Sequence, residues 1–83
     1  MIYIENHAIK RCNSRFPEIN KKHINEYIII AAIDGKRIQH KMKKNISASI
    51  YHNMVLIIKT YGKDEYVITV LDKNKKTINW WNN

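Results

Sequence analysis

The chain has 83 residues, the size of one small domain with a single modest core, which excludes an active site buried between several layers. Fifteen Lys and Arg residues against seven Asp and Glu give a formal net charge of +8. This charge favours a polyanionic partner such as RNA, DNA, a membrane surface or an acidic protein. The single cysteine, Cys12, excludes an internal disulfide framework and a cysteine-pair metal site.

The longest apolar run, Tyr27 to Ile33, falls far short of the roughly 20 residues that cross a bilayer, so we expect a soluble protein with no membrane partner. Met1 to Ile4 is followed at once by polar residues, which does not resemble a secretion signal. A cytoplasmic site of action is therefore expected. The chain contains no linker, repeat or low-complexity tract, which predicts one compact domain over residues 1–83.

The first predicted helix begins near Asn6, whose side chain can cap it. His7, Arg11 and Arg15 recur at every fourth position and therefore lie close together on one face of this helix. A neighbouring face can pack on a core through Ala8, Ile9, Cys12 and Phe16. A titratable imidazole beside two permanent cations suits a phosphate group, whereas a solvated basic helix face is the commoner meaning of such a stripe.

The second predicted helix follows Pro17, which interrupts the first one. Asn20 can cap the new helix, and Gly35 is a natural end for it. Its buried face is expected to consist of Ile24, Tyr27, Ile28 and Ala31.

From Lys36 onward, apolar and polar residues alternate as in strands. The first strand is predicted to place Ile38, His40 and Met42 on one face and mostly basic side chains on the other. Further strands are predicted over residues 46–51, 54–61 and 66–71, joined by hairpins at 52–53 and 62–64. Residues 76–83 could add an edge strand with Trp80 and Trp81 on opposite faces. The predicted fold class is α+β, with two N-terminal helices packed on a three- to five-stranded antiparallel sheet.

The segment from Lys36 to Lys44 is strongly basic and contains no acidic residue. If it is extended, its outward row could follow a phosphate backbone through Arg37, Lys41 and Lys43, and Lys59 of a neighbouring strand would enlarge this patch. Tyr51 could stack on unpaired bases, as could Tyr61 and the two tryptophans. Two simpler alternatives remain open: a solvated surface, or an edge strand that uses lysine against aggregation.

The pattern His7-Ala8-Ile9-Lys10-Arg11, the helix after it and the closing strand Tyr66 to Leu71 resemble the small domains grouped with barnase, colicin D and RelE-type toxins. More narrowly, they resemble a family of small bacterial domains with an N-terminal His-Ala-xx-Arg helix. The resemblance implies RNA cleavage without a metal or other cofactor, at the junction of the first helix and the sheet. It further implies that His7 is the helix histidine, that Arg11 binds phosphate, and that Thr69 is the polar residue of the last core strand.

These residue types suit the transesterification of RNA. An imidazole can take a proton from the 2′-hydroxyl, while arginines such as Arg11 and Arg15 can offset the charge that develops on phosphorus. The second proton carrier stays open among His40, His52, Tyr51 and the lysines. Plain structural roles are at least as common for such residues, because His40 falls on the apolar face of its strand and Thr69 has high strand propensity.

Two classes of function follow from the sequence. The first is a small endoribonuclease toxin that an acidic antitoxin or immunity protein would hold in check. The second is a non-catalytic protein of a phage or mobile element that grips nucleic acid or an acidic protein surface. The oligomeric state is not predicted.

Overall fold

The computed structural model describes residues 1–74 and Thr77, which form an α+β fold of two helices and a five-stranded sheet. In chain order its elements are β1 (Ile2–Ile4), α1 (Asn6–Arg15), the short 3-10 helix η1 (Lys21–His23), α2 (Ile24–Asp34), β2 (Lys36–Gln39), β3 (Ile46–Tyr51), β4 (Met54–Tyr61) and β5 (Asp64–Asp72). The edge strand predicted over residues 76–83, with Trp80 and Trp81, lies outside the described residues apart from Thr77.

The sheet has the strand order β1-β5-β4-β3-β2. Strands β2 to β5 form the predicted antiparallel meander, with turns at residues 52–53 and 62–63. The sheet is mixed, however, and not antiparallel throughout, because β1 pairs parallel to β5. The two predicted N-terminal helices are present, but the strand β1 that precedes them and its parallel pairing were not predicted. A three-residue strand is too short to show an alternation of apolar and polar residues. β1 forms because its backbone pairs with the edge of β5.

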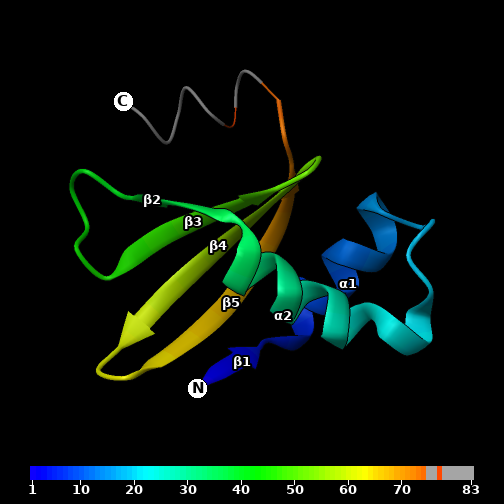
Figure 1. The fold of residues 1–83 in the computed structure, drawn as a ribbon, viewed down its shortest axis with the longest axis horizontal. Coiled ribbons are helices and arrows are strands. Elements are labelled where there is room, and N and C mark those ends of the chain that lie inside the picture. The colour runs from blue at the N-terminus through cyan, green and yellow to red at the C-terminus, as the bar shows by residue number, and fades with distance from the viewer. Residues whose placement is uncertain (75–76, 78–83) are drawn as a thin grey trace.

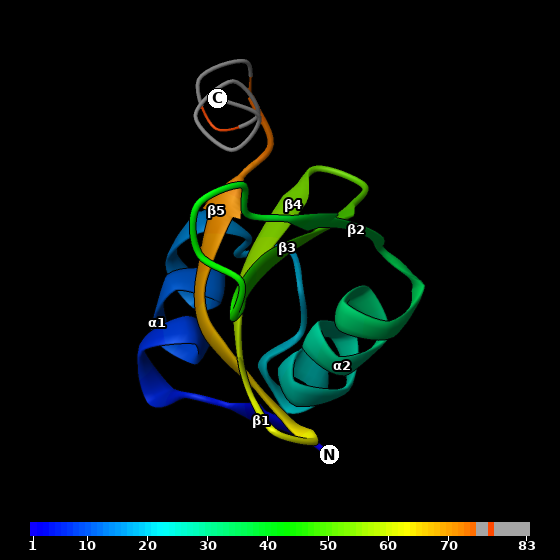
Figure 2. The same cartoon turned by 90° about the vertical axis from the view of Figure 1, so that its left-hand side faces the viewer.

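Both helices cover the same side of the sheet (Figures 1 and 2). Their buried side chains meet those of β4 and β5 in one core, which contains Ala8, Cys12, Phe16, Ile24, Ile28, Ala31, Ala32, Met54, Leu56, Ile58, Val67 and Val70. A second apolar cluster lies on the opposite face, where Ala48, Val55 and Ile57 are buried among partly exposed isoleucine and leucine side chains.

A β-bulge in β5 allows Val67 and Val70 to share the helix-side core. Residues three apart on a regular strand point to opposite faces. Here Ile58 pairs with Val67 and Ile57 pairs with Thr69, so that Ile68 is the extra residue. The bulge therefore turns both valines toward the helices and places Thr69 at an irregular point of the strand.

The helix boundaries follow local signals with one exception. Asn20 caps η1, which leads directly into α2, and its side-chain oxygen accepts a hydrogen bond from the backbone N–H of Lys22 at 3.0 Å. Gly35 ends α2 as expected, and a Cβ there would collide with Ser49 Oγ and the Ala31 carbonyl. The expected cap at Asn6 was wrong by one residue, because the N-cap of α1 is Glu5 and makes no side-chain capping bond.

The buried face of α2 differs from the prediction at two positions. Ile24, Ile28 and Ala31 are buried as expected, whereas Tyr27 is only half-buried. Ala32 is buried in addition. A small side chain fits this position because the helix lies close to the sheet near its C-terminal end, where Ser49 of β3 bonds to Ala31.

Strand β2 is shorter than predicted and ends at Gln39. Residues 40–45 form the loop to β3, in which Met42 is 84% exposed and belongs to no apolar face. The strand stops because two side chains bind the loop backbone: Gln39 Nε2 donates to the Lys44 carbonyl at 2.6 Å, and His40 Nδ1 accepts the Met42 N–H at 3.0 Å. Within residues 1–74 and Thr77, no helix is both long and apolar enough to cross a membrane.

Candidate functional site

The histidine and arginine of the first helix are in direct contact. Both side chains are exposed on α1, and Arg11 Nε donates a hydrogen bond to His7 Nε2 at 3.4 Å. The contact follows from their i, i+4 spacing. The contact places an imidazole nitrogen and a guanidinium side by side on the exposed face of the helix.

The two ends of α1 are anchored on β5. At its start, the Glu5 N–H donates to the Val67 carbonyl at 3.1 Å, and at its end Arg15 Nη1 lies 3.2 Å from Asp72 Oδ2. The helix between these anchors is about 15 Å long, and β5 from Val67 to Asp72 spans about 16 Å. Helix and strand therefore run side by side in the same direction.

Thr69 does not share a face of the sheet with His7 and Arg11. It pairs with Ile57, which lies in the apolar cluster opposite the helices, whereas the next residue, Val70, is buried in the helix-side core. Because directly paired residues of two strands point to the same face, the half-buried Thr69 side chain points away from α1. The catalytic role that the resemblance implied for Thr69 is therefore not favoured.

The expected second proton carriers do not join His7 and Arg11. His40 follows β2, at the opposite edge of the sheet, where its Nδ1 accepts the N–H groups of Met42 and Lys43 at 3.0 and 3.1 Å. His52 lies in the β3–β4 turn with a φ of 53°. This turn adjoins the end of β5, because Met54 pairs with Asp72, so His52 is at the Arg15 end of α1.

Tyr51 belongs to the helix-side core. It is half-buried, and its ring lies 5.8 Å from that of Tyr27 in an edge-on contact and 4.3 Å from that of His52. Burial raises the pKa of Tyr27, and the nearby Tyr51 raises it further. These contacts do not favour the base-stacking role that was predicted for Tyr51.

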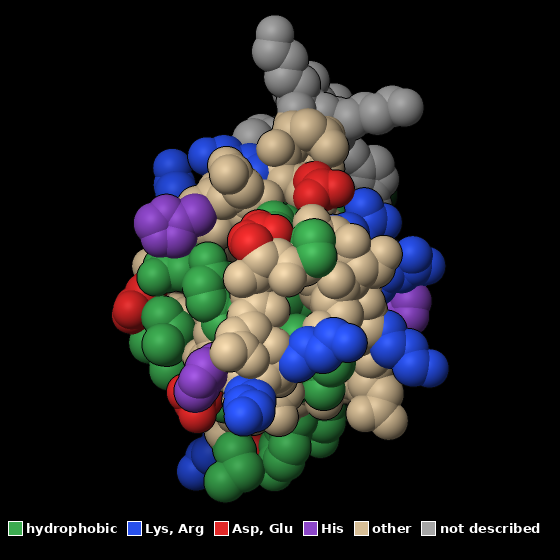
Figure 3. Space-filling model, turned by 90° about the vertical axis from the view of Figure 1, so that its right-hand side faces the viewer, with side chains coloured by type: hydrophobic (Ala, Val, Ile, Leu, Met, Phe, Trp, Pro, Cys, Tyr) green, Lys and Arg blue, Asp and Glu red, His purple; other side chains and the backbone are tan. Residues whose placement is uncertain are grey.

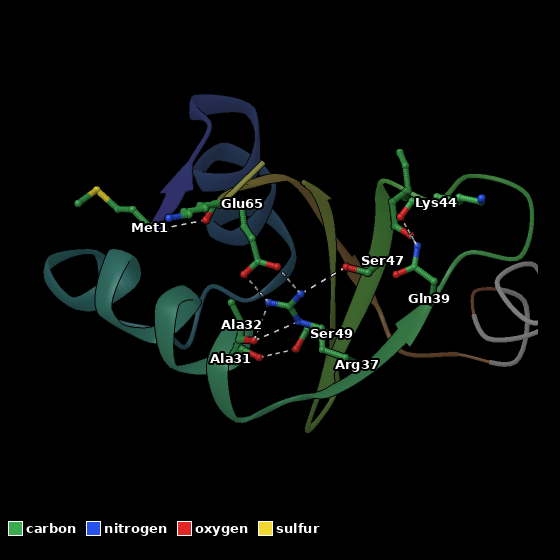
Figure 4. Close-up of polar contacts among 11 residues, drawn as sticks. Met1, Ala31, Ala32, Arg37, Gln39, Lys44, Ser47, Ser49 and Glu65 are labelled. Atoms are coloured by element: carbon green, nitrogen blue, oxygen red, sulfur yellow. Dashed lines mark hydrogen bonds and ion pairs between the residues drawn. The ribbon is translucent and has the colours of Figure 1, made fainter. Parts of the chain in front are cut away.

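Arg37 is held by structural partners, as Figure 4 shows. Its guanidinium forms a bidentate ion pair with Glu65 at 2.7 and 3.0 Å and donates twice to the Ala32 carbonyl at the end of α2. The hydrogen bonds from Arg37 are the main reason that the pKa of Glu65 is lowered, against the opposing effect of burial. The phosphate contact predicted for Arg37 is therefore not favoured. Nothing in the sequence marks Glu65 as its partner, because 28 residues separate them.

The predicted lysines gather on the β2–β3 loop, not on an extended strand. Lys41, Lys43 and Lys44 are exposed, and the loop that carries them is tied down by Gln39 and His40. A further tie is the Thr60 N–H, which donates to the Asn45 carbonyl at 2.8 Å. Lys59 pairs with Ile46, the first residue after the loop, and so extends the basic loop onto the sheet as predicted.

Charged groups on the side of the molecule that shows α1 and the start of α2 are mixed (Figure 3). Lys and Arg side chains alternate there with acidic, histidine and apolar ones. Residues 1–74 and Thr77 contain no cluster of His, Cys, Asp or Glu that could hold a metal ion. No protein-family model and no curated protein sequence matches this chain.

Proposed function

We propose that this protein is an RNA-directed endoribonuclease that cleaves by transesterification without a metal, at the junction of α1 and β5. The observation that carries the proposal is the exposed contact between His7 and Arg11 on α1, the helix that packs along β5. An imidazole can accept the proton of the 2′-hydroxyl, and a guanidinium can offset charge on the phosphate. The resemblance to the barnase, colicin D and RelE group points the same way.

In the proposed reaction, His7 Nε2 removes the proton of the 2′-hydroxyl, and the 2′-oxygen attacks the adjacent phosphorus. The bond to the 5′-oxygen breaks, and this oxygen takes a proton from solvent. Arg11 leaves its hydrogen bond with His7 to bind a phosphate oxygen and offset the developing charge. The products are a 2′,3′-cyclic phosphate and a 5′-hydroxyl end.

Such an enzyme would act as a toxin in the cytoplasm, and the net charge of +8 fits an acidic antitoxin or immunity protein as its inhibitor. A second candidate is a non-catalytic protein of a phage or mobile element that grips nucleic acid or an acidic protein surface. One observation favours it: His40 and His52, the other candidates for proton transfer, lie away from His7.

The test is incubation of the purified protein with total RNA and transfer RNA in EDTA, with product ends read on a gel. We expect cleavage to 2′,3′-cyclic ends by the wild type and a loss of at least about 100-fold in His7→Ala, which lacks the general base.

His23→Ala is the matched control, because His23 is another exposed helix histidine, paired with Glu26 and not with an arginine. It should cleave like the wild type. Undiminished cleavage by a clean preparation of His7→Ala would refute the catalytic assignment. Intact RNA with a salt-sensitive mobility shift in the wild type would favour the non-catalytic candidate.

A further inference from the structure

Three tyrosines meet on the sheet face that the helices leave uncovered. Tyr3 of β1 pairs directly with Tyr66 of β5, and their rings stack at 5.0 Å with an interplanar angle of 19°. Tyr61, near the end of β4, contacts Tyr66 edge-on at 5.7 Å. We call Tyr3, Tyr61 and Tyr66 the tyrosine platform.

The alternation along each strand puts the platform opposite the helices. Ile2 and Ile4, on either side of Tyr3, pack against the helix-side core, as does Val67 next to Tyr66. On β4, Ile58 is also in that core, so Lys59 and Tyr61 point to the other face. The platform and the helices therefore lie on different sides of the sheet.

The platform keeps much of its aromatic surface open. Tyr61 is 54% exposed and Tyr3 is 42% exposed, although a cross-strand tyrosine pair that served only the sheet would gain by covering its rings. Tyr3 lies on the edge strand, and among the described residues only Tyr66 is in ring contact with it. The stack can therefore be continued by another flat ring.

A lysine side chain lies beside these rings. Lys59 Nζ lies 5.1 Å from the centre of the Tyr61 ring, and Lys59 is the direct cross-strand partner of Tyr66. The same row continues to Ile46, which follows the basic loop with its exposed lysines. The nearby carboxylate of Asp64 is balanced by the N-terminal ammonium group at 3.5 Å. The face thus combines open aromatic rings with the Lys59 ammonium group and, beyond it, the exposed lysines of the β2–β3 loop.

We propose that the tyrosine platform binds single-stranded RNA, with a base stacked on Tyr3 or Tyr61 and phosphates held by Lys59 and the basic loop. Stacking on aromatic side chains beside a positively charged path is how proteins bind single strands. A duplex binds poorly to such a surface because its bases are already stacked on one another. The charge distribution favours this ligand over an acidic protein, which would use the lysines and leave the rings open.

The platform and the proposed cleavage site lie on different faces of the sheet. Strand β1, at the edge of the sheet, leads from Tyr3 directly into α1. An RNA strand held on the platform would therefore pass around this edge to reach His7 and Arg11. This proposal rests on the RNA-directed part of the proposed function and is independent of catalysis.

The experiment measures binding by fluorescence anisotropy of a labelled 2′-O-methyl oligouridylate, in which the blocked 2′-oxygen prevents cleavage. Tyr61→Leu and Tyr3→Leu remove the ring and keep an apolar side chain, and Tyr61→Phe keeps the ring. We expect each leucine variant to weaken binding about tenfold, and Tyr61→Phe to bind like the wild type. Ile33→Ala, which trims an exposed apolar side chain on α2, is the control and should change nothing.

Circular dichroism verifies the fold of each variant. If Tyr3→Leu fails to fold, Tyr61→Leu still tests the proposal, because Tyr61 lies near the exposed end of β4. Unchanged affinity of folded Tyr61→Leu would overturn the platform, as would equal binding of a duplex by the wild type. His7→Ala should bind the oligonucleotide normally. If the protein does not cleave RNA but its binding depends on the tyrosine rings, the nuclease proposal alone is rejected. If it cleaves RNA and its binding does not depend on the rings, the platform proposal alone is rejected.

Discussion

Replacing Arg37 by methionine tests whether one side chain joins α2, β2 and β5. The variant keeps the apolar stem of the side chain and removes the guanidinium with all its hydrogen bonds. These bonds reach the Glu65 carboxylate, the Ala32 carbonyl and Ser47 Oγ. Leu or Ala would also remove packing of the stem and would therefore report on two effects at once.

The expected loss can be worked out from the exposure of each contact. A bidentate pair with a carboxylate is worth up to about 3 kcal/mol when buried. Here the Arg37 and Glu65 side chains are 34% and 27% exposed, so solvent screening reduces the pair to about 1 kcal/mol. The bonds to the Ala32 carbonyl contribute about 1 kcal/mol more. The free energy of unfolding should thus fall by about 2 kcal/mol, and Tm by about 10 °C for a domain of this size.

The loss should also depend on pH. Arg37 lowers the pKa of Glu65 in the folded state below its ordinary value of 4.5, so the contribution of the pair is complete above that value. It is lost as the pH falls through the lowered pKa of Glu65. The difference in stability between wild type and Arg37→Met should therefore be constant from pH 6 to 7 and shrink in acid.

Urea unfolding followed by circular dichroism, at neutral pH and at about pH 3, measures both effects. Arg11→Met is the matched control, since its side-chain partner among the described residues is the exposed His7, and it should cost less than about 0.5 kcal/mol. Equal stability of Arg37→Met and Arg11→Met at neutral pH would show that the contacts of Arg37 do not hold the fold.

Three further variants and one chemical probe address the core and the turns. Gly35→Ala should lower the free energy of unfolding by about 2–3 kcal/mol, because the added Cβ would collide with Ser49 Oγ and the Ala31 carbonyl. Gly62→Ala should lower it by only about 1 kcal/mol, because space is open there but the φ of 59° is unfavourable for alanine. Urea titrations measure both changes. Leu56→Ala should cost about 2–5 kcal/mol, because the fully buried side chain leaves a cavity, and a thermal melt of this variant resembling the wild type would contradict that burial. Burial raises the pKa of the Cys12 thiol, so a thiol reagent at pH 8 should label Cys12 only after unfolding, and rapid labelling of the native protein would place it at the surface.

The candidate site was partly predictable because its key spacing is local. His7 and Arg11 are four residues apart, and a helix brings that spacing into contact wherever it forms. Thr69 was named only through a resemblance, and the bulge that positions it has no clear local signal. The roles predicted for Arg37 and Tyr51 were drawn from charge and residue type alone, which do not reveal partners distant in the sequence.

Tertiary pairing likewise decided which tyrosines became exposed. Tyr3 and Tyr66 are separated by most of the chain and meet only because β1 pairs parallel to β5. The sequence pattern does not predict that they meet. Of the two tyrosines proposed from the sequence for base stacking, Tyr51 packs against the helix-side core, whereas Tyr61 is exposed on the opposite face.

Features that depend on neighbours along the chain were predictable from the sequence. Asn20 marks the start of the second helical segment and Gly35 marks its end, and the alternation over residues 46–71 predicts three strands and their hairpins. Capping, turn formation and the side-chain period of a strand all act over a few residues. Only the tertiary structure decided the parallel β1, the bulge beside Thr69 and the ion pair of Arg37 with Glu65. These depend on which distant segments meet when the chain closes around its core, and that choice minimises the free energy of the whole fold.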